Sequence, residues 1–150
     1  MIRLLVASLF FIGASLANAE EARILAPFTT DGCSWSPDGT LNNPTKYQGC
    51  CKLHDYEYWI GGSREDRKAA DRAFRQCLRT VGASHPVHTI YYRAVRINGG
   101  PRGCSFCWGY GWRPQTRGYA PLSRDEESQV PEMTEEEILN TPITLRRNNL

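Results

Sequence analysis

One ten-residue stretch, 50–59, constrains the fold of this chain more than any other part of the sequence. It contains neither proline nor glycine, and it can run as a helix that begins near Thr45 or Lys46 and ends before Gly61. Residues four apart share a helix face, so Cys50 lies one turn before His54 and Tyr58 lies one turn after it. An ordinary amphipathic helix would carry leucine or valine on this face. Here the face carries Cys50, Cys51, His54, Asp55 and Tyr58.

Residues 1–19 have the pattern of a secretory signal peptide. Arg3 precedes an apolar run, 4–16, and the sequence Ala-Asn-Ala follows at residues 17–19. The alternative is a membrane anchor, but the run is shorter than the about 20 apolar residues that a membrane-spanning helix needs. We therefore expect the segment to be removed and the protein to be secreted, either to the extracellular space or to a periplasm.

Net charge gives no indication of a polyanionic partner. The chain has 18 lysine and arginine residues against 16 aspartate and glutamate residues, and loss of Arg3 with the signal peptide leaves 17 basic residues. Because the mature protein is nearly neutral, its overall charge predicts binding neither to nucleic acid nor to anionic surfaces.

Six cysteines lie downstream of the signal peptide. An even number of cysteines in an exported chain of this length predicts three disulfides. Zinc is the alternative, but the spacing lacks two CxxC pairs and the chain has only three histidines. We expect one mature helical domain, residues 20–112, whose small core depends on disulfides. The cysteines are Cys33, Cys50, Cys51, Cys77, Cys104 and Cys107.

The segment 30–39 is a loop by composition. Asp31 and Asp38 supply hard oxygen ligands, and Gly32 lets the backbone turn so that its carbonyls can point inward. Oxygen ligands on a flexible loop suit calcium rather than zinc. Aspartate and glycine in a loop are also ordinary turn residues, so this pattern by itself leaves both interpretations open.

A second helix is predicted from Ser63, which can cap it together with Asp66, to about Thr80. Asp71 lies at the edge of its apolar stripe. Because a carboxylate that faces a core is costly unless it is paired, the position favours a buried and partnered Asp71 over an exposed helix charge. A third helix, 86–97, has a broad apolar face suited to packing on the first two.

The residues after the third helix are less informative. Cys104 and Cys107 form a CxxC sequence without the βαβ setting of a redox motif, which favours a small disulfide-closed loop. The aromatic segment 108–112 either covers the core or offers a surface to lipid or a partner, and we favour the first interpretation. The polar remainder, 113–150, is predicted to be a flexible tail, in which 134–139 could form a short capped helix.

Taken together, these motifs resemble the secreted phospholipase A2 superfamily. The sequence CCKLHDYEY at 50–58 matches the CCxxHDxxY active-site helix of that family at every defined position. The sequence DRAFRQC at 71–77 matches the D-x-A-x-x-x-C pattern of its second long helix. The sequence DGC at 31–33 resembles the calcium loop of the shorter prokaryotic and fungal branch. The resemblance covers roughly residues 31–78.

The resemblance implies a mainly α fold in which two antiparallel helices are joined by disulfides. By position, one disulfide would be Cys50–Cys77, between the two helices. The other would be Cys33–Cys51, which would hold the calcium loop beside Asp55. A third helix would pack against this pair.

The resemblance also implies a catalytic set. His54 would be the general base that takes a proton from water as the water attacks an ester carbonyl, and an imidazole with a pKa near 6.5 suits that task at neutral pH. Asp71 would hold the far ring nitrogen of His54 and fix its tautomer. Tyr58 would donate a hydrogen bond to Asp71.

The implied cofactor is Ca²⁺, which would polarise the ester carbonyl and stabilise the oxyanion. Its expected ligands are Asp55 and either Asp31 or neighbouring carbonyls such as that of Gly32. The glycine-rich loop of the animal enzymes is absent, and Ser34 stands where that loop has a glycine whose N–H helps to bind the oxyanion. Serine retains this N–H.

Two classes of function follow from the resemblance. The first is a secreted, calcium-dependent phospholipase A2-type hydrolase, a monomer that acts on a phospholipid membrane or micelle surface and binds no nucleic acid. The second is a catalytically silent binding or toxin-like module of the same fold. A silent relative has no need of the set His54, Asp55, Tyr58 and Asp71, so the sequence favours the enzyme.

Overall fold

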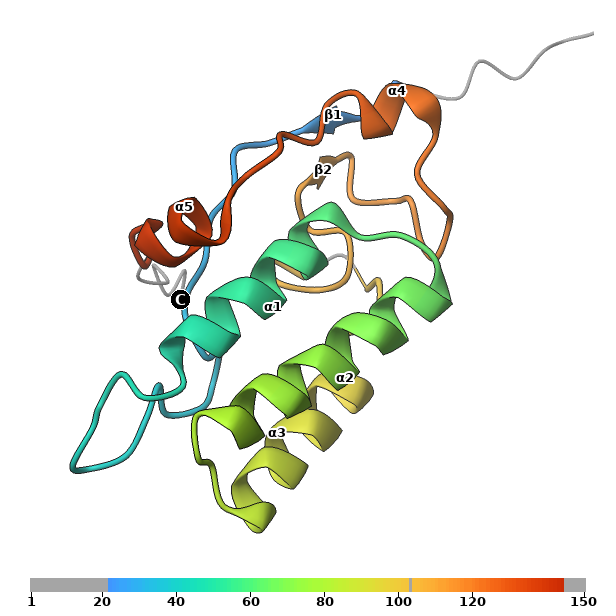
Figure 1. Cartoon of the computed structure of the whole chain (residues 1–150). Helices are drawn as coiled ribbons and strands as arrows, with labels where there is room; N and C mark the ends of the chain where they lie inside the picture. Colours follow the sequence, from blue (N-terminus) through green and yellow to red (C-terminus); the bar gives the residue numbers. More distant parts are fainter. Residues whose placement is uncertain (1–21, 103, 145–150) are drawn as a thin grey trace, which may run out of the picture.

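The structure is a computed structural model that describes residues 22–102 and 104–144 (Figure 1). The described chain is mainly helical with one small antiparallel sheet, which confirms the predicted mainly α class. The predicted signal peptide, 1–19, lies outside the described residues. Within them, no helix has the length and apolar character needed to cross a membrane. The elements are β1 (Ile24–Leu25), α1 (Gln48–Ile60), α2 (Arg64–Thr80), α3 (His85–Asn98), β2 (Trp112–Arg113), α4 (Arg124–Glu127) and α5 (Glu135–Asn140).

Helices α1 and α2 run antiparallel beside each other (Figure 1). α1 begins slightly later than expected because the residues before it form turns, among them a bridge between Thr40 and Asn43. It ends where Gly61 takes a positive φ of 73°, a conformation that favours glycine. The predicted capping box of α2 is confirmed, since Ser63 accepts from the Asp66 N–H and the Asp66 side chain accepts from the Ser63 N–H.

The predicted third helix, α3, packs against α2 (Figure 1). Two groups of buried side chains form the core. One lies around the cysteines of α1 and includes Phe74 and Leu78. The other is aromatic, joining Tyr58 and Trp59 of α1 to Trp108.

The aromatic segment 108–112 covers the end of α1, as the sequence favoured. Trp108 and Trp112 are buried. Their indole N–H groups donate to the carbonyls of Gly62 and Ile60, at 2.8 Å and 2.6 Å. Carbonyls at a helix C-terminus lack partners within the helix, so these tryptophans satisfy polar groups as well as bury apolar area.

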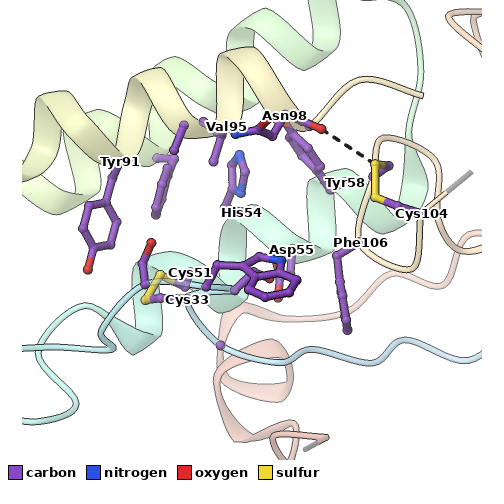
Figure 2. A pocket seen from close by; sticks show the side chains of 18 residues that line it. Cys33, Cys51, His54, Asp55, Tyr58, Tyr91, Val95, Asn98, Cys104 and Phe106 are labelled. Carbon is purple, nitrogen blue, oxygen red and sulfur yellow. Dashed lines mark hydrogen bonds between the residues drawn. A yellow bond between two sulfur atoms is a disulfide. The ribbon is translucent and has the colours of Figure 1, made fainter. Parts of the chain in front are cut away.

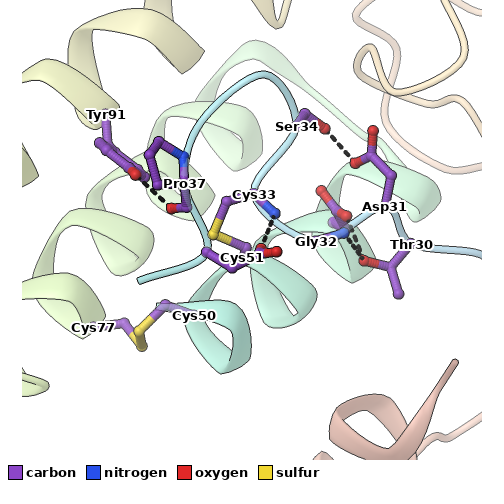
Figure 3. The surroundings of a disulfide bond; sticks show 12 residues. Thr30, Asp31, Gly32, Cys33, Ser34, Pro37, Cys50, Cys51, Cys77 and Tyr91 are labelled. Atoms are coloured by element: carbon purple, nitrogen blue, oxygen red, sulfur yellow. Dashed lines mark hydrogen bonds between the residues drawn. A yellow bond between two sulfur atoms is a disulfide. The ribbon is translucent and has the colours of Figure 1, made fainter. Parts of the chain in front are cut away.

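Three disulfides tie the loops to this helical frame, and they join the cysteines in the predicted pairs. Cys50–Cys77 links α1 to α2, and Cys33–Cys51 links the loop before α1 to the first turn of that helix (Figure 3). The third disulfide, Cys104–Cys107, closes the small loop expected from the CxxC sequence. Three disulfides are compatible with an oxidising compartment.

Loss of the Cys50–Cys77 disulfide is expected to destabilise the fold more than loss of Cys104–Cys107. The two bonds join cysteines 27 and 3 residues apart in sequence. Loop-closure entropy predicts losses of about 3.5 kcal/mol for the longer loop and about 2 kcal/mol for the shorter one. The free energies of unfolding in urea of the two Cys→Ala double variants measure this difference, and equal losses would contradict it.

The structure differs from the flexible tail predicted for 113–150. Residues 113–144 include α4 and α5, and α5 packs against α1 (Figure 1). Tyr119 of the same segment accepts a hydrogen bond from Arg67 of α2. The buried ion pair between Arg117 and Glu126 spans 2.9 Å, and Lys52 of α1 donates to the carbonyls of Leu139 and Thr141. Polar side chains and backbone carbonyls make these contacts, so low apolar content gave no indication of them. α5 begins with the expected Thr134 cap.

Candidate active site

His54 of α1 and Asp71 of α2 meet across the interface of the two helices. His54 Nε2 lies 2.9 Å from Asp71 Oδ1, and both side chains are buried. A carboxylate can only accept, so Nε2 carries the hydrogen and Nδ1 keeps its lone pair. The expected pairing of the far ring nitrogen with Asp71 agrees with this contact. It also explains how a carboxylate is tolerated on the inner face of α2.

Tyr58 completes this cluster as the sequence predicted. Its hydroxyl donates to Asp71 Oδ1 at 2.7 Å. Burial, followed by the charge of Asp71, raises the pKa of Tyr58, so the phenol keeps its proton and remains a donor. Burial by itself would raise the pKa of Asp71, but hydrogen bonds from His54, Tyr58 and Arg96 hold it below its usual value. Asp71 is therefore an anion that accepts bonds on both oxygens.

The surroundings of His54 keep its imidazole neutral. The ring stacks on Phe74 with centroids 4.5 Å apart and lies against Tyr58 on the same helix. Burial lowers the pKa of His54, and the hydrogen bond from its ring to Asp71 opposes this shift in part. The buried ring is thus a neutral base at neutral pH, with one nitrogen engaged by Asp71.

Two arginines that are not among the predicted site residues bind the same cluster. Arg96 Nη1 lies 2.5 Å from Asp71 Oδ2. Arg67 Nε donates to the Tyr58 hydroxyl at 3.1 Å. Arg67 stands four residues before Asp71 on α2, a spacing that could have indicated the contact. Arg96 comes from α3, and no motif in the sequence points to it.

Asp55 lies on the neighbouring stripe of α1 and faces the loop 30–39. Its Oδ2 accepts from the hydroxyl of the fully buried Thr30 at 2.6 Å. Burial raises the pKa of Asp55 well above its usual range, and the nearby charges of Asp31 and Asp38 raise it further. Among the described residues, no lysine or arginine forms an ion pair with Asp55. This carboxylate therefore lies in an acidic environment that a cation would relieve.

The other expected calcium residues lie in the same loop (Figure 3). Asp31 accepts from the Ser34 hydroxyl, and Asp38 Oδ1 accepts from the Cys33 N–H at 2.8 Å. Gly32 has a φ of 73°, and a Cβ there would lie 2.6 Å from Asp38 Oδ1, so the tight turn needs glycine. In the described part of the chain, no three His, Cys, Asp or Glu side chains are grouped to hold a metal ion.

The carboxyl-terminal segment holds this loop from outside. The Thr144 N–H donates to the Thr30 carbonyl at 2.8 Å, and Thr30 forms a parallel bridge with Ile143. Lys52 fixes the preceding residues to α1 through two backbone carbonyls. Thr30 therefore contacts Ile143 and Thr144 through its backbone and Asp55 through its side chain.

A cavity of about 580 Å³ brings His54 and Asp55 together (Figure 2). α3 lies along one side of it, the Cys33–Cys51 disulfide lies on the opposite side, and the loop with Phe106 lies at one end (Figure 2). Trp35, which is 91% exposed, lines its edge. The other apolar lining includes Phe74, Tyr91, Ala94, Val95 and Phe106. A base and a buried carboxylate therefore share one largely apolar cavity.

Comparisons of the whole chain with protein-family models, with characterised proteins and with solved structures find no significant match.

Proposed function

We propose that the protein is a secreted, calcium-dependent hydrolase of the phospholipase A2 type that cleaves an acyl ester of a phospholipid. One observation carries the proposal: His54 and Tyr58, both bonded to the buried Asp71, line a largely apolar cavity that Asp55 also lines. A base supported by a carboxylate suits proton abstraction, and an apolar cavity of this size suits an acyl chain.

In the proposed reaction, His54 activates a water molecule. Nδ1 takes a proton from the water while the water oxygen attacks the ester carbonyl carbon, and the protonated imidazole then gives a proton to the leaving alcohol. Asp71 accepts from Nε2 throughout, so it fixes the tautomer and stabilises the positive charge that forms on the ring. Tyr58 holds the accepting oxygen of Asp71 in place.

The residues around Asp55 fit a calcium ion by their chemistry. A buried carboxylate beside two further acidic side chains favours a cation, and the donors on the loop are oxygens, which calcium prefers. Asp55, Asp31 and the carbonyl of Gly32 would hold the ion. When bound, calcium would polarise the ester carbonyl and stabilise its developing negative charge.

Exposed apolar side chains near the cavity support a lipid surface as the partner. Trp35 lines the cavity edge and is 91% exposed. On α3, Ile90 and Ile97 are largely exposed and lie one turn on either side of the cavity residue Ala94. A rim of this composition would bury apolar area in a membrane or micelle.

Trp35→Ala is expected to lower hydrolysis of phospholipid vesicles about tenfold, because partial burial of an indole in lipid contributes roughly 1.4 kcal/mol to binding. Hydrolysis of a short-chain substrate below its micellar concentration should change little. Ile24→Ala is the matched control, since Ile24 is also exposed but does not line the cavity. An equal loss on both substrates would show that Trp35 acts within the site rather than at a lipid surface.

Calcium-dependent turnover of mixed phospholipid vesicles, with identification of the products, tests the proposed function. Free fatty acid and lysophospholipid are expected with calcium, and neither is expected after chelation. Vesicle binding without hydrolysis of any lipid class would instead support a catalytically silent module of the same fold.

A further inference from the structure

We propose that Arg96 is a positioning residue for the His54–Asp71 pair, an inference that rests on the proposed hydrolase. Asp71 Oδ1 accepts from His54 and Tyr58, at 2.9 Å and 2.7 Å, and Oδ2 is bound by Arg96 at 2.5 Å. Arg96 does not line the cavity, so it acts on the reaction only through Asp71.

The contact on Oδ2 decides how the carboxylate is oriented. The terminal torsion of an aspartate is broad, so donors on one oxygen leave the group free to rotate. A guanidinium on the other oxygen fixes the plane of the carboxylate. His54 then meets the same oxygen in the same direction at each turnover, and its Nδ1 keeps a fixed place in the cavity. Asp71 is completely buried, so Arg96 also supplies the charge partner that a buried anion needs.

Arg67 holds the end of α3 from which Arg96 extends. Its Nη2 donates to the carbonyls of Val95 and Arg96, at 2.7 Å and 2.9 Å. Its Nε donates to the Tyr58 hydroxyl and lies 3.8 Å from Asp71 Oδ2. Arg67 is buried, whereas the Arg96 side chain is 30% exposed. One buried arginine therefore joins the last turn of α3 to the cluster between α1 and α2.

Arg96→Met tests this role, with Arg96→Lys as the conservative variant. Loss of the guanidinium is expected to lower kcat on a short-chain ester by about 10- to 100-fold, with KM changed less than about twofold, because outer partners of catalytic groups have effects of this size. Arg96→Lys should recover part of kcat, since it keeps the charge but not the planar guanidinium. Arg93→Met, an exposed arginine one turn earlier on α3, should leave both parameters unchanged.

A spectroscopic measurement separates positioning from general loss of stability. In the calcium-free wild type, the hydrogen on His54 Nε2 should give a sharp low-field proton resonance at low temperature, because it is buried and bonded to a carboxylate. The resonance should broaden or disappear in Arg96→Met and return in part in Arg96→Lys. This comparison needs no activity, so it tests Arg96 even if the wild type hydrolyses no ester and the proposed function fails.

Two results would overturn the inference. One is a folded Arg96→Met protein with the kcat and the His54 resonance of the wild type. The other is a loss of kcat with an unchanged resonance. If Arg96→Met does not fold, Arg96→Lys alone decides, because it keeps the charge and removes the guanidinium. It should lower kcat selectively and broaden the resonance, and wild-type values for both would reject the proposal.

Discussion

His54→Gln is expected to lose nearly all ester hydrolysis while calcium binding is retained. General-base catalysis contributes about 10²- to 10⁴-fold, and glutamine cannot take a proton from water at neutral pH. His54 is neutral in its buried position and lies beside, not among, the expected calcium ligands, so its loss should not weaken the ion's site. Single-turnover hydrolysis of a labelled phospholipid, together with calcium titration by calorimetry, measures both quantities on the same protein.

His88→Gln is the matched control for this experiment. His88 is also buried and also on a helix, but it contacts Arg75 of α2 and does not line the cavity. It should hydrolyse the substrate at the rate of the wild type. If His54→Gln retained wild-type turnover, the activity would lie elsewhere and the catalytic role proposed for His54 would be wrong.

The predictable part of the site lies on α1 and α2, and helical periodicity explains why. Four-residue spacing places His54 and Tyr58 on one face of α1, and a carboxylate on the apolar side of α2 requires a partner. With the resemblance, these two local features predict that Asp71 lies beside His54 and Tyr58, and the structure has both contacts. The Cys50–Cys77 disulfide, which the resemblance implies, joins the same two helices.

Contacts between distant segments could not be predicted in this way. Arg96 belongs to a helix whose arginines look like a solvated charged face, and only the packing of α3 on α2 brings it to Asp71. Thr30 reaches Asp55 across 25 residues, without a pattern that marks it. Two backbone carbonyls of the carboxyl-terminal segment accept from Lys52 of α1, and composition carries no information about such acceptors.

Asp55→Asn is expected to have opposite effects on stability with and without calcium. In the folded protein, burial raises the pKa of Asp55 above its value in the unfolded chain. Folding of the calcium-free protein is therefore penalised once the pH exceeds the unfolded pKa. The penalty grows until the pH passes the folded pKa. An asparagine carries no charge at any pH, so at neutral pH the calcium-free Asp55→Asn protein should melt above the calcium-free wild type.

Calcium should reverse this order. Binding to the folded state at 100 times the dissociation constant stabilises the wild type by about 2.7 kcal/mol, or roughly 10 °C in Tm for a chain of this size. This increase in Tm should be larger at pH 8 than at pH 5, because protons compete with calcium for the Asp55 carboxylate. Asp55→Asn should lose most of the increase at both pH values, while the exposed Asp125→Asn, the matched control, should behave as the wild type. Thermal melts of the wild type and of Asp55→Asn, each with calcium and with chelator, measure these differences. An unchanged wild-type Tm at millimolar calcium would contradict the proposed ligand role of Asp55.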